Sequence, residues 1–143
     1  MEPFIVVLVV AVALLVLLWW GRTRSLRREK AIVASRESDS LETFVASFRP
    51  EVRPIASAVY AELQNYSAAG QFPFRKSDNV ADVLKIGKID VDDALTQVAK
   101  RFACRKPSKE DDTKFRERAT LEEYVEFLHH LKPKVTLPGS TPV

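Results

Sequence analysis

The fold is decided by the stretch Phe4–Trp20, FIVVLVVAVALLVLLWW, in which seventeen consecutive positions lack any charge, amide or hydroxyl. At about 1.5 Å per residue, a helix of this length spans roughly 26 Å, near the short end of what crosses the hydrocarbon core of a bilayer. Because a helix satisfies its own backbone hydrogen bonds in lipid, the stretch predicts one transmembrane helix. Residues 1–21 are therefore expected to be a membrane anchor.

Aromatic and basic side chains follow the apolar stretch, in an order typical of a membrane boundary. The residues expected to lie at this boundary are Trp19, Trp20, Arg22, Arg24, Arg27 and Arg28. A single charge, Glu2, precedes the stretch, and positive charge stays on the cytoplasmic side. We therefore expect a single-pass protein of the cell (inner) membrane, with its N-terminus outside and residues 21–143 in the cytoplasm. A cleaved signal peptide would instead have basic residues before the apolar core and a small-residue cleavage site, and neither is present.

The formal net charge of +3 resides just after the apolar stretch. Residues 21–30 contain five basic side chains against one glutamate, and Glu2 removes one unit, so residues 31–143 are neutral overall. Residues 22–38, in which the helical pattern is weak, are predicted to be a basic juxtamembrane stalk. Such a stalk attracts anionic lipid of the inner leaflet, at about 1 kcal/mol per basic side chain near the surface. A neutral domain does not favour nucleic-acid binding.

Residues 39–132 show helical periodicity and no strict alternation of apolar and polar residues, which predicts an all-α domain. The expected helices cover approximately residues 41–48, 55–66, 80–84, 91–102 and 121–131. The residues expected to cap these helices are Asp39 with Glu42, Ser77 or Asp78, Asp90, and Thr120 with Glu123.

Irregular segments separate these helices. Phe72 precedes a proline, which favours an extended backbone, and we expect Phe72 and Phe74 to hold this loop on the core. Residues 108–118 are almost entirely charged and predict a solvated connection. Residues 133–143 are rich in proline and have no periodicity, so they are expected to be a disordered tail.

The order of the elements over residues 55–131 resembles that of an acyl or peptidyl carrier protein. In that family a leucine-glycine turn precedes an aspartate-serine-leucine step at the start of the second long helix. The corresponding residues here are Ile86-Gly87-Lys88-Ile89-Asp90-Val91-Asp92. Gly87 and Val91 match, but Asp90 replaces the serine that carries phosphopantetheine. The resemblance implies a four-helix, carrier-like bundle that has lost the attachment chemistry, so no cofactor is expected.

Carrier-type domains present the N-terminal end of this helix to other proteins. The resemblance therefore implies a protein-binding surface at Asp90, Asp92 and Asp93, which would meet a basic patch. A calcium loop is not favoured, because the glycine and the final glutamate of that motif are missing. Helix capping is the simpler explanation of these aspartates.

No motif predicts catalysis or a metal site. His129 and His130 are adjacent and would point about 100° apart on a helix, so they cannot bind one ion together. Cys104 is the single cysteine, which suits a reducing cytoplasm, and its position predicts a packing role. The chain has four glycines and no glycine-rich phosphate loop.

These observations favour a non-catalytic membrane-anchored domain that binds an unidentified protein partner on the cytoplasmic side. One alternative is a membrane-tethered acyl carrier serving lipid or cell-envelope synthesis, which would need a modified serine such as Ser77. Another is a structural protein that forms homo-oligomers through the apolar face Leu41–Phe48. The end Thr141-Pro142-Val143 fits a loose carboxylate-binding pattern that occurs often by chance.

Overall fold

A computed structural model of the chain describes residues 3–108, 111 and 119–133. Its elements, in chain order, are α1 (Pro3–Ser35), α2 (Leu41–Ala46), the 3-10 turn η1 (Pro50–Val52), α3 (Arg53–Gln64), α4 (Val80–Leu84), α5 (Lys88–Arg101) and α7 (Leu121–Leu131). Within the described residues no strand forms, and the all-α class is confirmed. The predicted tail 133–143, apart from Pro133, and most of the charged connection 108–118 lie outside the described residues.

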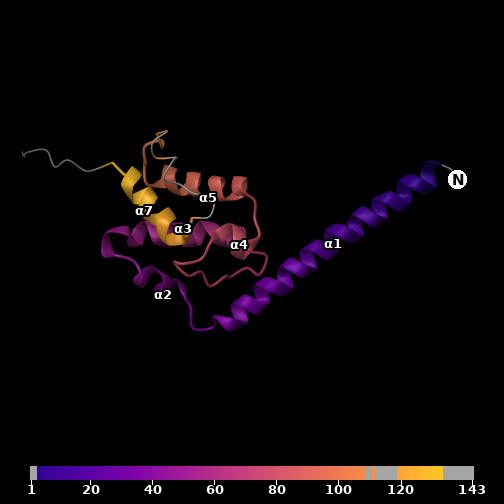
Figure 1. The fold of residues 1–143 in the computed structure, drawn as a ribbon, viewed down its shortest axis with the longest axis horizontal. Helices are drawn as coiled ribbons and strands as arrows, with labels where there is room; N and C mark the ends of the chain where they lie inside the picture. Colours follow the sequence, from indigo (N-terminus) through magenta and orange to yellow (C-terminus); the bar gives the residue numbers. More distant parts are fainter. Residues whose placement is uncertain (1–2, 109–110, 112–118, 134–143) are drawn as a thin grey trace, which may run out of the picture.

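Helix α1 is one continuous helix of 33 residues that projects away from the rest of the molecule (Figure 1). Its length and composition are sufficient to cross a membrane, and its apolar part is not buried against the domain. Most of the stalk predicted over residues 22–38 is helical, since α1 continues to Ser35 although the helical pattern there is weak. This segment contains arginine, leucine, glutamate, lysine and alanine but no proline, so nothing stops the helix from continuing.

The remaining helices pack around α3, which contacts α2, α5 and α7 (Figure 1). The apolar positions of α7, the helix predicted over residues 121–131, are all buried: Leu121, Tyr124, Val125, Leu128 and Leu131. On α5, Val91, Ala94 and Val98 are buried, and Leu95, Ala99 and Phe102 pack at the edge of the core. The short α4 contacts α1 and α5. The four-helix, carrier-like bundle stays a prediction.

The loop between α3 and α4 enters the core through two phenylalanines, as the sequence predicted. Phe72 and Phe74 are 0% and 1% exposed, with ring centroids 4.9 Å apart. Gln64 satisfies the backbone of Phe72 on both sides, since its Nε2 donates to the Phe72 carbonyl at 2.7 Å and its Oε1 accepts from the Phe72 N–H at 2.7 Å. The hydroxyl of Tyr60 donates to the same carbonyl at 3.0 Å. A buried irregular backbone is tolerated here because its polar groups are paired.

Three predicted caps differ from the structure. Ser40, not Asp39, caps α2, and its capping box partner is Thr43. Asn79 caps α4 through its side chain, which accepts from the Asp82 N–H.

Helix α5 begins at Lys88 after Gly87, so Asp90 lies inside its first turn and is not the cap. Helix α4 ends at Leu84, and the residue that caps it, Lys85, adopts a left-handed conformation with φ of 55°. Several polar residues near each helix start could serve as the cap. Asp39 and Asp78 bind residues far away in the chain, so the neighbouring Ser40 and Asn79 cap the helices instead.

The face Leu41–Phe48, predicted as a surface for self-association, is mostly used inside the domain. Phe44 and Phe48 are 3% and 5% exposed, and their rings stack edge-on with centroids 5.0 Å apart. Leu41 is 42% exposed. One side chain is too small an apolar surface for a stable interface, so the structure does not favour this route to oligomers.

The capping box at the start of α7 is formed as predicted. Thr120 accepts a hydrogen bond from the Glu123 N–H, and the Glu123 carboxylate accepts from the Thr120 N–H at 2.8 Å. Thr120→Ala should lower the free energy of unfolding by about 1 kcal/mol, because the Glu123 N–H loses its partner. Urea denaturation of the protein in lipid nanodiscs measures this change. Thr120→Ser keeps the hydroxyl and should stay close to wild type; equal losses in both variants would contradict the cap assignment.

Candidate functional site

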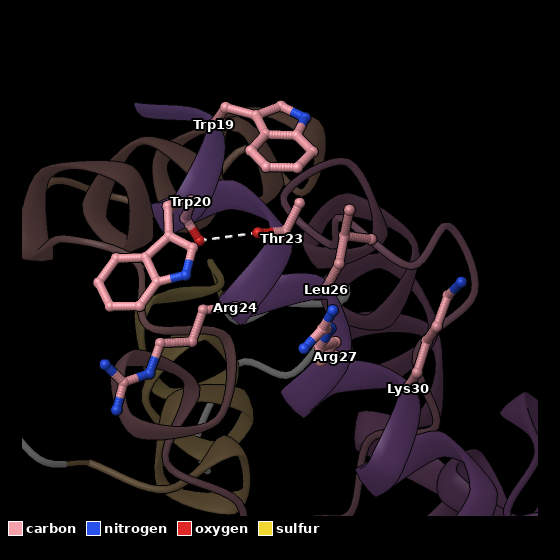
Figure 2. Close-up of a pocket in the computed structure, with 7 residues that line it drawn as sticks. All are labelled: Trp19, Trp20, Thr23, Arg24, Leu26, Arg27 and Lys30. Carbon is pink, nitrogen blue, oxygen red and sulfur yellow. Dashed lines mark hydrogen bonds between the residues drawn. The ribbon is translucent and has the colours of Figure 1, made fainter. Parts of the chain in front are cut away.

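Residues 19–30 of α1 carry the aromatic and basic side chains that were expected from the sequence to lie at a membrane boundary. We call Trp19, Trp20, Arg22, Arg24, Arg27, Arg28 and Lys30 the aromatic–basic segment. Its two tryptophans are 68% and 61% exposed. An open groove of about 670 Å³ runs along it, lined by Trp19, Trp20, Thr23, Arg24, Leu26, Arg27 and Lys30 (Figure 2).

Figure 2 shows how these side chains divide. Trp20 and Arg24 project to one side of the helix, Leu26 and Lys30 project to the other, and Thr23 donates to the Trp20 carbonyl at 2.9 Å. Apolar rings next to guanidinium and ammonium groups suit a phosphate-rich lipid boundary. The arrangement is a surface of a single helix and not an enclosed cavity.

The opposite face of α1 is attached to the domain, which the sequence did not predict. Glu29 is 2% exposed, and its carboxylate accepts hydrogen bonds from the Ser67 hydroxyl at 3.0 Å and the Ala69 N–H at 3.1 Å. Ile32 and Val33 pack against the core cluster. Arg28 donates to the Asp82 carbonyl at 3.3 Å, and this bond links α1 to α4.

A buried ion pair completes this attachment just after the end of α1. Arg36 donates two hydrogen bonds to Asp78, one of them at 2.8 Å from Nη2 to Oδ1, and a third to the Pro73 carbonyl at 3.0 Å. The side chains are 15% and 6% exposed. Asp78 also accepts from the Arg75 N–H at 2.8 Å. Charge pairing with full hydrogen bonding compensates the burial of both ions.

The three aspartates predicted to bind a partner do not form one cluster. Asp90 and Asp93 lie near Glu62 and Tyr66 at the end of α3; burial raises the pKa of Tyr66, and these carboxylates raise it further. Asp92 faces α7, where burial, Asp92 and Glu123 together raise the pKa of Tyr124.

We call Glu62, Asp90 and Asp93, with Tyr66 and the adjacent Ile89, the acidic surface. Ile89 is 77% exposed, the largest exposed fraction of a bulky apolar side chain that the structure describes outside α1. The sequence could have flagged it, because Ile89 falls outside the apolar stripe of its helix.

Asp92 instead lies at one end of a groove of about 550 Å³ between α5 and α7. Leu95, Ala99 and Leu128 line its apolar part, and Lys100 and Lys106 lie at its other end. Cys104 lies in this groove and donates to the Leu128 carbonyl at 3.5 Å. Burial raises the pKa of the Cys104 thiol, which lowers its reactivity and agrees with a packing role.

The histidines of α7 diverge, as their spacing predicted. His130 lies 3.8 Å from Asp111, whereas the Nδ1 atom of His129 is buried. Asp111 is primarily bound to Arg105, at 2.7 Å, and to Ser108; hydrogen bonds from these two residues hold the pKa of Asp111 well below its usual range. Among the described residues, no group of three or more histidine, cysteine, aspartate or glutamate side chains could hold a metal ion.

Comparisons with protein families, with curated proteins and with solved structures found no match to this chain. The carrier-protein resemblance is therefore neither supported nor contradicted by a relative.

Proposed function

We propose that this chain is a single-pass membrane protein whose helical domain lies on the cytoplasmic side and binds a protein partner through the acidic surface, without catalysing a reaction. The observation that carries the proposal is the position of this surface. It lies on the part of the domain attached to the basic half of α1, which places a bound partner next to the membrane.

The attachment of the domain to α1 supports this position. Tyr66 belongs to the acidic surface, and the next residue, Ser67, bonds to Glu29 on α1. Glu29 lies nine residues after Trp20, or about 14 Å along the helix. In Figure 1 the N-terminal end of α5 and helix α4 lie on the side of the domain that faces α1. A partner bound there contacts the domain close to the lipid headgroups.

The chemistry of the acidic surface favours a basic partner. The acidic surface carries three carboxylates, Asp90 and Asp93 from α5 and Glu62 from α3. Carboxylates around an exposed isoleucine suit a partner with arginine or lysine around an apolar side chain. Opposite charges of this kind speed association and fix orientation. The two tryptophans of the aromatic–basic segment meanwhile lie at the boundary of the inner leaflet and hold α1 at its depth.

The test is photo-crosslinking from position 89 of the full-length protein in its native membrane. A photoreactive residue in place of Ile89 should give one dominant protein adduct, identified by mass spectrometry. Asp90→Asn with Asp93→Asn should reduce the adduct roughly tenfold, as should raised salt, because charge attraction brings the partner in.

Asp92→Asn, compared with the single variants Asp90→Asn and Asp93→Asn, is the matched control, since it removes one carboxylate from the same helix on the α7 side. It should leave the adduct unchanged. Absence of any protein adduct, or equal loss in the control and the double variant, would refute the acidic surface as the binding site.

A further inference from the structure

Resting on the proposed function, we infer that the partner of the acidic surface is a second copy of this chain, whose aromatic–basic segment on α1 supplies the opposite charge. Two copies inserted in parallel then form a two-fold symmetric dimer in which each acidic surface contacts the other α1. The two contacts are identical, as a closed dimer requires.

The face of α1 that points away from its own domain provides the docking surface. At about 100° per residue, Trp20, Arg24 and Arg27 lie within about 40° of the direction opposite the buried Glu29. Arg24 and Arg27 are exposed, and among the described residues none of the domain packs on this face. The 670 Å³ groove lies here, and the exposed Ile89 is an apolar side chain that it can receive (Figure 2).

The two surfaces lie at the same depth below the membrane. Ser67, the residue after Tyr66 of the acidic surface, contacts Glu29, and the Asp82 carbonyl accepts from Arg28, so these neighbours of the acidic surface lie at the level of residues 28–29 of α1. On the docking face, Arg27 lies within about 3 Å of this level along the helix axis and Arg24 within about 8 Å. Because the apolar span holds every copy at the same height and in the same direction, a neighbouring copy presents these cations where the carboxylates need them.

The choice of a second copy over another basic protein follows from this match. An unrelated partner needs basic side chains at the depth of the acidic surface, whereas every copy of this chain already carries Arg24 and Arg27 on α1. An anionic lipid headgroup is the competing occupant of the same basic face. It would neutralise Arg24 and Arg27 but would leave Asp90 and Asp93 without a basic partner.

Charge reversal with complementation tests the dimer. The first variant is Asp90→Lys with Asp93→Lys, and the second is Arg24→Asp with Arg27→Asp, which keeps Arg22, Arg28 and Lys30 for topology. Energy transfer between donor-labelled and acceptor-labelled full-length protein in phosphatidylcholine liposomes measures association. Each variant alone should lose association about tenfold or more, since like charges then meet at both contacts. Their equimolar mixture should recover it, because every contact again joins opposite charges.

The circular dichroism spectrum of each variant should match that of the wild type, and a loss of helical signal would identify a variant that does not fold. The inference is overturned if the wild-type protein is monomeric, if charge reversal does not change association, or if the two variants do not complement each other. Association that requires anionic lipid and is not restored by mixing the variants would assign the basic face to lipid. The outcome is separate from that of the proposed function. If the crosslink at position 89 joins a different protein while the purified chain stays monomeric, the second-copy inference fails and the proposed function stands.

Discussion

Replacing Asp78 by alanine is expected to lower the free energy of unfolding by about 4 kcal/mol, because it leaves the guanidinium of Arg36 buried without its counter-ion. The change also removes the acceptor of the Arg75 N–H. Urea denaturation of the full-length protein in nanodiscs should show the midpoint falling by about 2 to 3 M. Hydrogen exchange should show the loss of protection concentrated where the residues after α1 meet the loop before α4.

The matched control is Glu126→Ala, which removes an ion pair of ordinary surface type. Arg49 and Glu126 are 60% and 40% exposed, and such pairs contribute about 1 kcal/mol or less. A loss at Asp78 no larger than the loss at Glu126 would show that the Arg36–Asp78 pair does not hold the domain to α1. The acidic surface would then not be held at a fixed position relative to α1.

Phe72→Ala is expected to cost about 4 kcal/mol in the free energy of unfolding, since it removes a fully buried ring from one end of an aromatic cluster. Phe72 packs on Phe74, and the cluster continues from Phe74 to Tyr60 with centroids 5.4 Å apart. The cavity left behind cannot close easily, because Gln64 and Tyr60 hold the backbone at this position. The same urea titration measures the loss.

Ile89→Ala is the control for this change, because it shortens an apolar side chain that is 77% exposed. Its cost should stay within about 0.5 kcal/mol, as for most surface substitutions. A similar small cost for Phe72→Ala would mean that the loop 71–78 is not part of the folded core. Ile89→Ala should nevertheless weaken association of the full-length chain. This result would show that Ile89 contributes to binding and not to the stability of the fold.

Much of the helical pattern could be predicted from local sequence. The apolar run at Phe4–Trp20, the inward positions of α7 and the Thr120–Glu123 capping box depend on residues three or four positions apart. Such patterns are visible in the sequence because helix geometry alone brings those residues together. The buried pair Phe72 and Phe74 was also predictable, since two phenylalanines around a proline are too apolar to stay in solvent.

The caps and the extent of α1 could not be predicted in the same way. Asp39 and Asp78 are good capping residues by type, but Asp39 binds Arg75 and Asp78 binds Arg36, 36 and 42 positions away in the chain. The charged segment after Trp20 gave a weak helical pattern because its buried side is short and includes Glu29, a residue type rarely buried without partners. Its partners come from residues 67 and 69, which the local sequence does not connect to α1.

The sequence by itself determined that this protein has an apolar helix long enough to span a membrane, a basic flank and an all-helical domain, because each depends on composition or on short-range spacing. Only the tertiary structure decided that α1 is attached to the domain through Glu29 and Arg36. It also decided that Asp90 and Asp93 lie near Tyr66 at the end of α3, whereas Asp92 lies near Tyr124 of α7. These features depend on contacts between residues far apart in the chain, whose partners are chosen by packing and by the need to satisfy buried charge.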